Sequence, residues 1–392
     1  MNDHDRNVYI IGAGFSKIAG IPLMKDFIDE ARKLLSSFFF QSFEKIFDYQ
    51  SRLSSSLRTM NLDIDNIEEL FGLLDLNIAV TDDKELSETR NILINMISQV
   101  IEMKDKTNAR LDGGIGTRIH ELGEYRVKKQ NVNYMRDIHY SGSPNSYDVG
   151  IDSYLLFGGL ITGLMQDKHP DGLYNTNVYK DTIISFNYDL VLDRALDKQI
   201  FPLAIDYVVN REYFKKIDPN CDSPAYRLPR VKLLKMHGSI GFKVCSKCGI
   251  VVADNSKAPK KCVLCDSDLS NVSSLILPPT WNKAEHKNKI LDIWKEGYHE
   301  LSNARRIIII GYSFPETDIF FKHLLGVSLS QNKRLEKFIV VDPNEAVGNK
   351  YKNMMNQKFG ERNFFYIKTG FPSVLHSSDY VNFRNLINRR VQ

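Results

Sequence analysis

The sequence predicts an α/β fold, in which a Rossmann-like parallel sheet carries a large helical insertion and a small cysteine-rich module. Three observations support this fold class. Short apolar runs rich in β-branched residues end at Gly, Pro, Asn or Asp, long amphipathic stretches separate the first two runs, and four cysteines form two close pairs. Strands of a parallel sheet are buried on both faces, so they read as continuous apolar runs. The predicted strands are residues 8–11, 182–186, 307–310, 338–341 and 364–367.

The composition is that of an ordinary globular protein. Of 392 residues, 43% are hydrophobic and 26% charged, and 52 Lys and Arg against 48 Asp and Glu give a net charge of +4. This near balance argues against a dedicated nucleic-acid or membrane binder. No apolar run approaches the ~18 residues of a membrane span, and the polar residues 1–7 lack the features of a secretory signal. We therefore expect a cytoplasmic protein without a membrane partner.

The amphipathic stretches between the first two strands predict helices inserted into a single sheet domain. They cover residues 27–35, 67–76 and 88–103. Gly- and Ser-rich segments at 113–116 and 141–147 indicate loops between helices, and after the cysteines a helix is predicted over 284–301. We therefore expect one domain over residues 1–392, with a helical insertion over 24–180 and a cysteine module over 243–270.

A glycine-rich turn follows the first predicted strand and precedes a helix that is predicted to start at Lys17. The turn consists of Gly12, Ala13, Gly14, Phe15 and Ser16. Such a turn can present backbone N–H groups and the Ser16 hydroxyl to a phosphate at the positive end of the helix. We interpret it as a pyrophosphate-binding turn, with an ordinary strand-to-helix turn as the alternative. Because Lys17 stands where a dinucleotide-dependent dehydrogenase has a third glycine, hydride transfer is disfavoured.

Two further segment ends carry candidate catalytic groups. The strand 182–186 is followed by Asn187 and Asp189, and the apolar segment 233–236 is followed by His237. Open α/β sheets bind ligands at the carboxyl edge of their strands, so the amide of Asn187 can fix a ribose hydroxyl or a water there. His237 is suited to taking a proton near neutral pH. The alternatives are a helix start at Asn187, a helix cap at Asp189 and a structural role for His237.

Four of the five cysteines predict a structural zinc site of the ribbon type. The ligands are Cys245, Cys248, Cys262 and Cys265, in two Cys-x2-Cys pairs with 13 residues between them, and Cys221 stands apart. Each pair supplies two thiolates from one tight turn, and four thiolates leave no open coordination position for catalysis. A redox dithiol and an iron–sulfur cluster are the alternatives. The few lysines of the module equally suit a solvated surface, so no sequence-specific nucleic-acid binding is expected.

Two later strand ends offer further polar groups at the same edge. The residues after strands 307–310 and 338–341 are Gly311, Tyr312 and Ser313, and Asp342, Pro343 and Asn344. Together they complete a nucleotide pocket, whereas each one alone is an ordinary Pro-containing turn.

The order of these motifs resembles the sirtuin superfamily, and more closely its sirtuin-like branch in bacterial defence systems. The similar segments are residues 12–16 with 19–22, 186–189, 237–238, the two cysteine pairs, 277–281, 311–313 and 342–344. The resemblance implies an NAD-binding fold in which the glycine turn and Ile21 contact the dinucleotide. It also implies a catalytic His237. Contacts to ribose and adenine are implied for Gly311, Ser313, Asp342 and Asn344.

Two departures from the deacylases of that superfamily bear on the activity. Pro22 is followed by Leu-Met-Lys-Asp-Phe in place of Asp-Phe-Arg, so the arginine beside the scissile nicotinamide ribose has no evident counterpart. Gly14 and Asn187 are 187 − 14 = 173 positions apart, far more than in a compact deacylase. Helical additions of this kind resemble those of sirtuin-like NAD hydrolases. The missing arginine disfavours acyl-lysine deacylation.

The resemblance therefore implies an NAD hydrolase that yields nicotinamide and ADP-ribose and acts as the effector of an anti-phage system. Asn187 would position the ribose or a water, His237 would be the general base, and Asp189 would support them. An NAD-dependent protein deacylase and a non-catalytic NAD or ADP-ribose sensor are the alternatives. The branch also implies a homo-oligomer and a partner such as a HerA-type ATPase.

Overall fold

The computed structural model describes residues 6–34, 43–57, 62–105, 107, 146–161, 181–197, 204–210, 230–277, 287–359, 361–376 and 379–387. Several sequence predictions lie outside these residues, namely the loops at 113–116 and 141–145, Cys221, residues 278–281 and the start of the predicted helix 284–301. The predicted loop 141–147 is wrong at its end, because Ser146 and Tyr147 already belong to a helix.

The centre of the molecule is a seven-stranded sheet in which every strand pairing is parallel. Its strands are β1 Asn7–Ile11, β2 Thr182–Ser185, β3 Ala204–Asp206, β4 Arg230–Lys235, β8 Arg306–Ile310, β9 Lys337–Val341 and β10 Phe364–Ile367. The five predicted strands are confirmed, and the predicted Rossmann-like sheet with them. β3 and β4 were not predicted as strands, since β3 has three residues and β4 mixes Arg and Lys with its apolar residues.

The strand order places a topological switch point at β1. The order is β10-β9-β8-β1-β2-β4-β3, so the chain first builds the sheet on one side of β1 and later returns to build the other side. Ile11 of β1 lies in register with Ser185 of β2 and with Ile310 of β8. In open α/β sheets, ligands bind beyond the carboxyl ends of the strands at such a point. The topology therefore directs attention to the residues that follow β1, β2 and β8.

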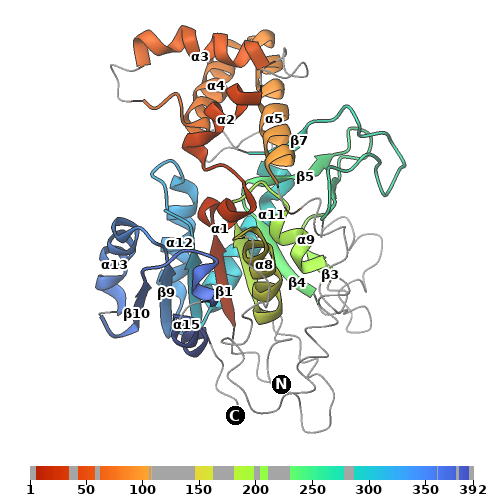
Figure 1. The fold of residues 1–392 in the computed structure, drawn as a ribbon. Coiled ribbons are helices and arrows are strands. Elements are labelled where there is room, and N and C mark those ends of the chain that lie inside the picture. The colour runs from red at the N-terminus through yellow and green to blue at the C-terminus, as the bar shows by residue number, and fades with distance from the viewer. Residues whose placement is uncertain are drawn as a thin grey trace.

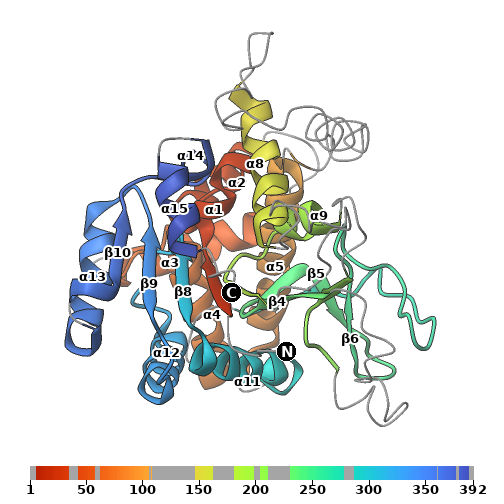
Figure 2. The same cartoon turned by 90° about the horizontal axis from the view of Figure 1, so that it is seen from below.

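Helices cover both faces of this sheet, with α11 and α12 on one side and α8 and α15 on the other (Figure 2). The α-helices are α1 Ala13–Ser16, α2 Phe27–Leu34, α3 Glu44–Leu57, α4 Ile67–Thr81, α5 Lys84–Lys104, α8 Ser146–Ile161, α9 Val191–Asp197, α11 Lys287–Asn303, α12 Ile319–Gln331, α13 Glu345–Phe359, α14 Ser373–His376 and α15 Asp379–Ile387. Short 3-10 helices are η1 Lys17–Ala19, η2 Met24–Asp26 and η6 Glu361–Asn363. Among the described residues, no helix is long and apolar enough to cross a membrane.

Between β1 and β2, most of the described residues beyond η2 belong to helices. α2, α3, α4 and α5 form a layer beyond the end of β1 at which α1 begins (Figure 1). Helices α4 and α5 start where Asn66 and Asp83 accept hydrogen bonds from the backbone N–H two residues ahead, which satisfies a free donor of the first turn. The buried residues of this layer and of the sheet belong to one continuous hydrophobic core. The division into a sheet domain and an insertion stays a prediction.

The cysteine module grows out of a second, three-stranded antiparallel sheet. Its order is β6-β5-β7, with β5 Gly238–Val244, β6 Val251–Ala253 and β7 Ser274–Ile276. The module has a small apolar core of its own around Leu269. Arg194 of α9 connects the helical layer to the cysteine module. It pairs with Asp105, which follows α5, and its Nε and Nη2 donate to the Ser256 carbonyl at 2.9 and 2.8 Å.

Candidate functional site

The predicted site residues start from strand ends that are joined by backbone hydrogen bonds at the carboxyl edge of the sheet. The Phe186 amide donates to Ile11 at 3.0 Å, the Met236 amide to Ser185 at 2.9 Å, and the Gly12 amide to Ile310 at 3.3 Å. The segments that follow β1, β2, β4 and β8 therefore leave the sheet side by side. The expectation that these motifs share one edge is met.

Close packing of two turns explains the glycines after β1 and β8. A Cβ on Gly12 would lie 2.8 Å from the Gly311 carbonyl oxygen, and a Cβ on Gly14 would lie 2.9 Å from the Gly311 Cα. Gly311 itself has φ +61°, and a Cβ there would lie 2.5 Å from the Phe15 nitrogen. Any larger residue would push the two turns apart, so these glycines allow the turns after β1 and β8 to pack against each other at the switch point.

The glycine turn differs from the expected phosphate cradle in three respects. The helix starts at Ala13 within the turn, and not at Lys17, because Gly12 already serves as the N-cap of α1. The Gly14 amide donates to the Gly311 carbonyl at 2.9 Å, and the Phe15 amide donates to the Gly12 carbonyl at 2.9 Å. The Phe15 ring is buried and stacks on Phe371, with ring centroids 4.2 Å apart. A pyrophosphate contact to the Gly14 amide would have to replace its present bond.

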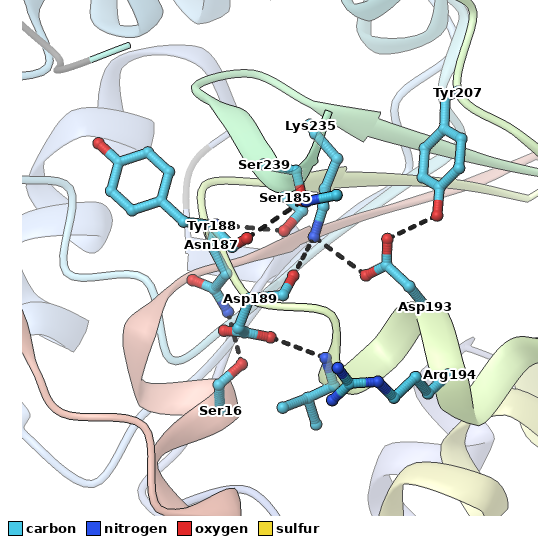
Figure 3. A network of polar contacts seen from close by, with 12 residues as sticks. Ser16, Ser185, Asn187, Tyr188, Asp189, Asp193, Arg194, Tyr207, Lys235 and Ser239 are labelled. Atoms are coloured by element: carbon cyan, nitrogen blue, oxygen red, sulfur yellow. Dashed lines mark hydrogen bonds and ion pairs between the residues drawn. The ribbon is translucent and has the colours of Figure 1, made fainter. Parts of the chain in front are cut away.

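Ser16 and Asn187 bring the ends of β1 and β2 into direct side-chain contact (Figure 3). The Asn187 Nδ2 donates to the Ser16 Oγ and to the Gly12 carbonyl oxygen, both at 2.9 Å. These two bonds fix the orientation of the amide. Its other end, the Oδ1 atom, is buried without a hydrogen-bond partner among the described residues. Buried polar atoms are almost always satisfied, so this open acceptor is a candidate ligand contact.

Asp189 has the capping role that the sequence left as an alternative. Its Oδ1 accepts from the Val191 amide at 3.0 Å, at the first residue of α9. Burial raises the pKa of the Asp189 carboxyl, while the Lys235 ammonium and a hydrogen bond from Ser16 oppose that rise. A direct catalytic contribution from Asp189 stays a prediction.

A buried ion pair lies beside this segment (Figure 3). The Lys235 Nζ donates to the Asp189 carbonyl oxygen at 2.5 Å and to the Asp193 Oδ2 at 3.0 Å. The Tyr207 hydroxyl donates to the other Asp193 oxygen at 2.7 Å, and burial raises the pKa of Tyr207 well above its ordinary value. The pair thus anchors the backbone that carries Asn187. None of Lys235, Asp193 and Tyr207 was a predicted site residue.

His237 is buried where β4 passes into β5, at 2% exposure. Its ring meets the Phe186 ring edge-on, with centroids 5.0 Å apart. Its Nε2 lies 3.4 Å from the Oδ2 of Asp318, a residue that the sequence analysis did not select. The Tyr312 hydroxyl donates to the same carboxylate oxygen at 2.6 Å. Only the pattern of an acid three residues after Pro315 could have pointed to Asp318, and that pattern also fits a plain helix cap.

The other predicted nucleotide contacts are spread over the same edge. Ile21 is buried and Ser313 is exposed. Asp342 is buried, and its carboxylate accepts from the Asn344 amide at 2.8 Å. Burial raises the pKa of Asp342. The Asn344 side chain accepts from the Ala346 amide at 3.0 Å, so it caps α13. Contacts of these residues to a nucleotide stay predictions.

The four paired cysteines come together as predicted. Their Sγ atoms all lie within 4.8 Å of one another. Tetrahedral zinc with Zn–S bonds of about 2.3 Å requires sulfurs about 3.8 Å apart, and three of the Sγ–Sγ distances, 3.5, 3.6 and 3.7 Å, are close to that value. These distances exclude disulfides, and the thiols are free. The Ser267 hydroxyl lowers the pKa of the Cys265 thiol to about 6. The cluster fits a structural zinc ion.

Substitution of Cys262 with serine is expected to abolish stoichiometric zinc binding and to lower the melting temperature, because a structural metal contributes its binding free energy to folding. Metal analysis by mass spectrometry together with a thermal melt measures both effects. The matched control is Cys221→Ser, which removes the cysteine outside the pattern and should retain zinc. Full zinc content in Cys262→Ser would contradict the four-thiolate site.

One family comparison agrees with this architecture. Residues 181–363, somewhat less than half of the chain, match the family model described as a SIR2-like domain. The matched region runs from the start of β2 to η6 and contains Asn187, His237 and the four cysteines. No curated protein matches the chain.

Solved structures with a similar arrangement include several Sir2 proteins. A Sir2 homologue in complex with NAD has a TM-score of 0.42 and 11% identity, over 98% of this chain and 92% of the other. A Sir2 bound to an inhibitor, 2'-O-acetyl-ADP-ribose and a deacetylated peptide has a TM-score of 0.33 and 14% identity, over 99% and 96%. A serine-to-alanine mutant of a Sir2 homologue with ADP-ribose has a TM-score of 0.31 and 12% identity, over 87% and 82%. At these values the likeness adds nothing to the topology described above.

Proposed function

We propose that this chain, whose residues 181–363 match a SIR2-like domain, is an NAD glycohydrolase that cleaves the nicotinamide–ribose bond. The observation that carries the proposal is the environment of Asn187. Its Nδ2 is held by two acceptors, while its buried Oδ1 has no partner among the described residues. An oriented, open acceptor at the carboxyl edge beside the switch point fits a ribose hydroxyl or a water.

The reaction requires the protein to orient the ribose and the attacking water and to supply one base that accepts a proton. The bond between the ribose carbon and the ring nitrogen breaks, and its electron pair neutralises the cationic nicotinamide ring as that ring leaves. The transition state is oxocarbenium-like, as in glycoside hydrolysis. Water forms the new C–O bond and loses a proton. We assign Asn187 to ordering the ribose hydroxyl or this water, and His237 to accepting the proton.

The remaining site residues would support or bind the dinucleotide. Asp189 supports the segment of Asn187 through its bonds to Ser16 and to the start of α9. The proposed dinucleotide contacts are Gly12, Ala13, Gly14, Phe15, Ser16, Ile21, Gly311, Ser313, Asp342 and Asn344. The side chain of Phe15 is committed to the core, so only its backbone is available for such a contact.

Two other functions use the same groups. An NAD-dependent protein deacylase would share Asn187 and His237, but the sequence lacks the arginine expected after Pro22. A non-catalytic sensor would bind NAD or ADP-ribose and leave it intact. The missing arginine favours hydrolysis over deacylation. The buried His237 favours hydrolysis over the sensor, since a sensor needs no proton acceptor.

The proposed biological role follows from the resemblance of the sequence to the defence branch of the sirtuin superfamily. NAD depletion by an effector would stop phage growth in an infected cell. Such an effector must stay silent until it is triggered, so we expect a cytoplasmic homo-oligomer that depends on a partner such as a HerA-type ATPase.

The experiment is chromatography of NAD after incubation with the purified protein, alone and together with the ATPase of its genomic neighbourhood. Wild type is expected to release nicotinamide and ADP-ribose in equal amounts. Asn187→Ala and His237→Ala should lower the rate by about 10²–10⁴-fold, the usual loss when a positioned acid–base group is removed. Thermal melts of the variants exclude unfolding as the cause.

The same samples separate the alternatives. Intact NAD in every mixture, with NAD protecting the protein against heat, would support the sensor. NAD consumed only when acyl-lysine peptides are present would support the deacylase. A control variant, Lys33→Met on the exposed face of α2, should keep the full rate.

A further inference from the structure

Asp318 occupies a helix-cap position without acting as a cap. It precedes the first residue of α12, where an Asp side chain normally accepts a hydrogen bond from the first turn, yet its carboxylate makes no such bond. The side chain is fully buried and points to the Nε2 of His237 at 3.4 Å and to the Tyr312 hydroxyl at 2.6 Å. Burying a carboxylate away from its own helix is unfavourable unless it is paired. The contacts with His237 and Tyr312 therefore explain why the Asp318 carboxylate is buried there.

The partners are themselves held rigidly. The Tyr312 ring stacks on the Phe186 ring, with centroids 4.2 Å apart and an angle of 12° between the planes. Phe186 also meets the His237 ring edge-on at 5.0 Å. The three rings come from the ends of β2, β4 and β8. Tyr312 and His237 thus both meet the same carboxylate oxygen, Oδ2 of Asp318.

A carboxylate at one nitrogen of an imidazole determines which nitrogen carries the proton. In a neutral ring, the nitrogen that faces the carboxylate holds the N–H, and the other nitrogen keeps the lone pair. The same carboxylate stabilises the imidazolium that forms when the lone pair takes a proton. With Asp318 facing Nε2 at 3.4 Å, this rule would leave Nδ1 as the basic atom of His237.

We propose that Asp318 is a positioning residue that keeps the proton of His237 on Nε2 and leaves Nδ1 as the base. This role rests on the proposed function, in which His237 accepts the proton released by water. Asp318 does not contact the substrate. It acts through His237, and Tyr312 acts through Asp318.

Other groups that face this pair do not replace Asp318. The Tyr188 ring lies 6.3 Å from the His237 ring, and burial, with Glu68 and Asp318 nearby, raises the pKa of Tyr188 well above its ordinary value. Tyr188 is therefore a neutral neighbour that donates to the Leu277 carbonyl at 3.2 Å. Glu68 of α4 accepts from Thr317 at 3.3 Å, which ties the turn before Asp318 to the helical layer.

The proposal is tested on the intact chain by two measurements. Long-range ¹H–¹⁵N NMR of protein labelled at its nine histidines reports the tautomer of each ring, and His237→Gln identifies the His237 signals. The wild-type ring is expected as the Nε2–H tautomer. In Asp318→Asn the ring should lose that uniform tautomer, while the other histidine signals stay in place. NAD cleavage by the same variant should show kcat lowered by about 10²–10⁴-fold with little change in KM.

Two variants complete the design. Tyr312→Phe keeps the stacked ring and removes the hydroxyl, so it should shift the His237 signals less than Asp318→Asn does. Asp83→Asn changes a cap of the ordinary kind at the start of α5, where an amide can also accept the bond, and should alter neither readout.

A wild-type His237 with its proton on Nδ1 would overturn the proposal, as would unchanged His237 signals in a folded Asp318→Asn. The NMR result does not depend on catalysis. If wild type shows the Nε2–H tautomer but never cleaves NAD, the pairing stands and the hydrolase function fails. If NAD is cleaved and Asp318→Asn keeps the full kcat, the hydrolase stands and the role of Asp318 fails.

Discussion

Replacement of Lys235 with methionine is expected to lower the free energy of unfolding by about 3–5 kcal/mol, the usual loss when one partner of a buried ion pair is removed. Lys235 is 1% exposed and pairs with Asp193 at 3.0 Å. Without the ammonium, the Asp193 carboxylate stays buried and keeps, among the described residues, the hydrogen bond from the Tyr207 hydroxyl, while the Asp189 carbonyl loses a donor. Urea unfolding followed by circular dichroism measures the loss.

The matched control is Lys33→Met, the same change in an exposed pair. The Lys33 Nζ lies 2.6 Å from the Glu30 Oε1 on α2. Exposed pairs of this kind contribute about 0.2–1 kcal/mol to the free energy of unfolding. A second variant, Lys235→Met with Asp193→Asn, removes both charges and keeps an acceptor for Tyr207, so it should recover a large part of the loss. Equal small losses for Lys235→Met and Lys33→Met would contradict the buried pair.

Substitution of Gly238 with alanine is expected to destabilise the protein by about 3–5 kcal/mol, because it combines a strained backbone with an overpacked contact. Gly238 has φ +76°, and a Cβ there would lie 2.0 Å from the Leu275 carbonyl oxygen of β7. The partner is backbone in a paired strand, so it cannot move aside without breaking the small sheet. The carbonyl of His237, the residue before Gly238, accepts from the Leu277 amide at 2.9 Å, so His237 belongs to the same close contact between strands.

Gly326→Ala is the control for this change. Gly326 lies inside α12, and a Cβ there meets nothing within 4 Å. Alanine should stabilise this helix by about 0.5–1 kcal/mol. Unfolding midpoints in urea for the two variants are therefore expected to move in opposite directions. A Gly238→Ala protein as stable as wild type would mean that the close approach of β5 to β7 is wrong.

The strands could be predicted because a strand that is buried on both faces consists of consecutive apolar residues. Runs such as Ile307 to Ile310 are apolar throughout, and this pattern belongs to strands covered on both faces. β4 interleaves charged with apolar residues, and its Lys235 is buried only because Asp193 lies opposite. No local pattern signals such a strand, since the compensation comes from another element.

Some residues of the candidate site could likewise be predicted from the sequence, and others could not. Asn187 and His237 directly follow apolar segments, so their place at the sheet edge could be predicted from the order of elements. Asp318 could not be selected, because an acid before a helix is indistinguishable from a cap until its carboxylate is seen turned toward His237. The amides of the glycine turn were expected to be open to a phosphate, yet Gly14 and Phe15 donate within the chain.

The sequence by itself determined the parallel sheet, the order of its strand-end motifs and the four-cysteine cluster, since these depend on local burial, turn chemistry and ligand spacing. Only the tertiary structure decided the close contact of the two glycine turns, the contact that orients the Asn187 amide against Ser16, and the pairing of His237 with Asp318. Each of these joins residues at least 80 positions apart. Distances across such separations are set by how the strands pack, which no local pattern records.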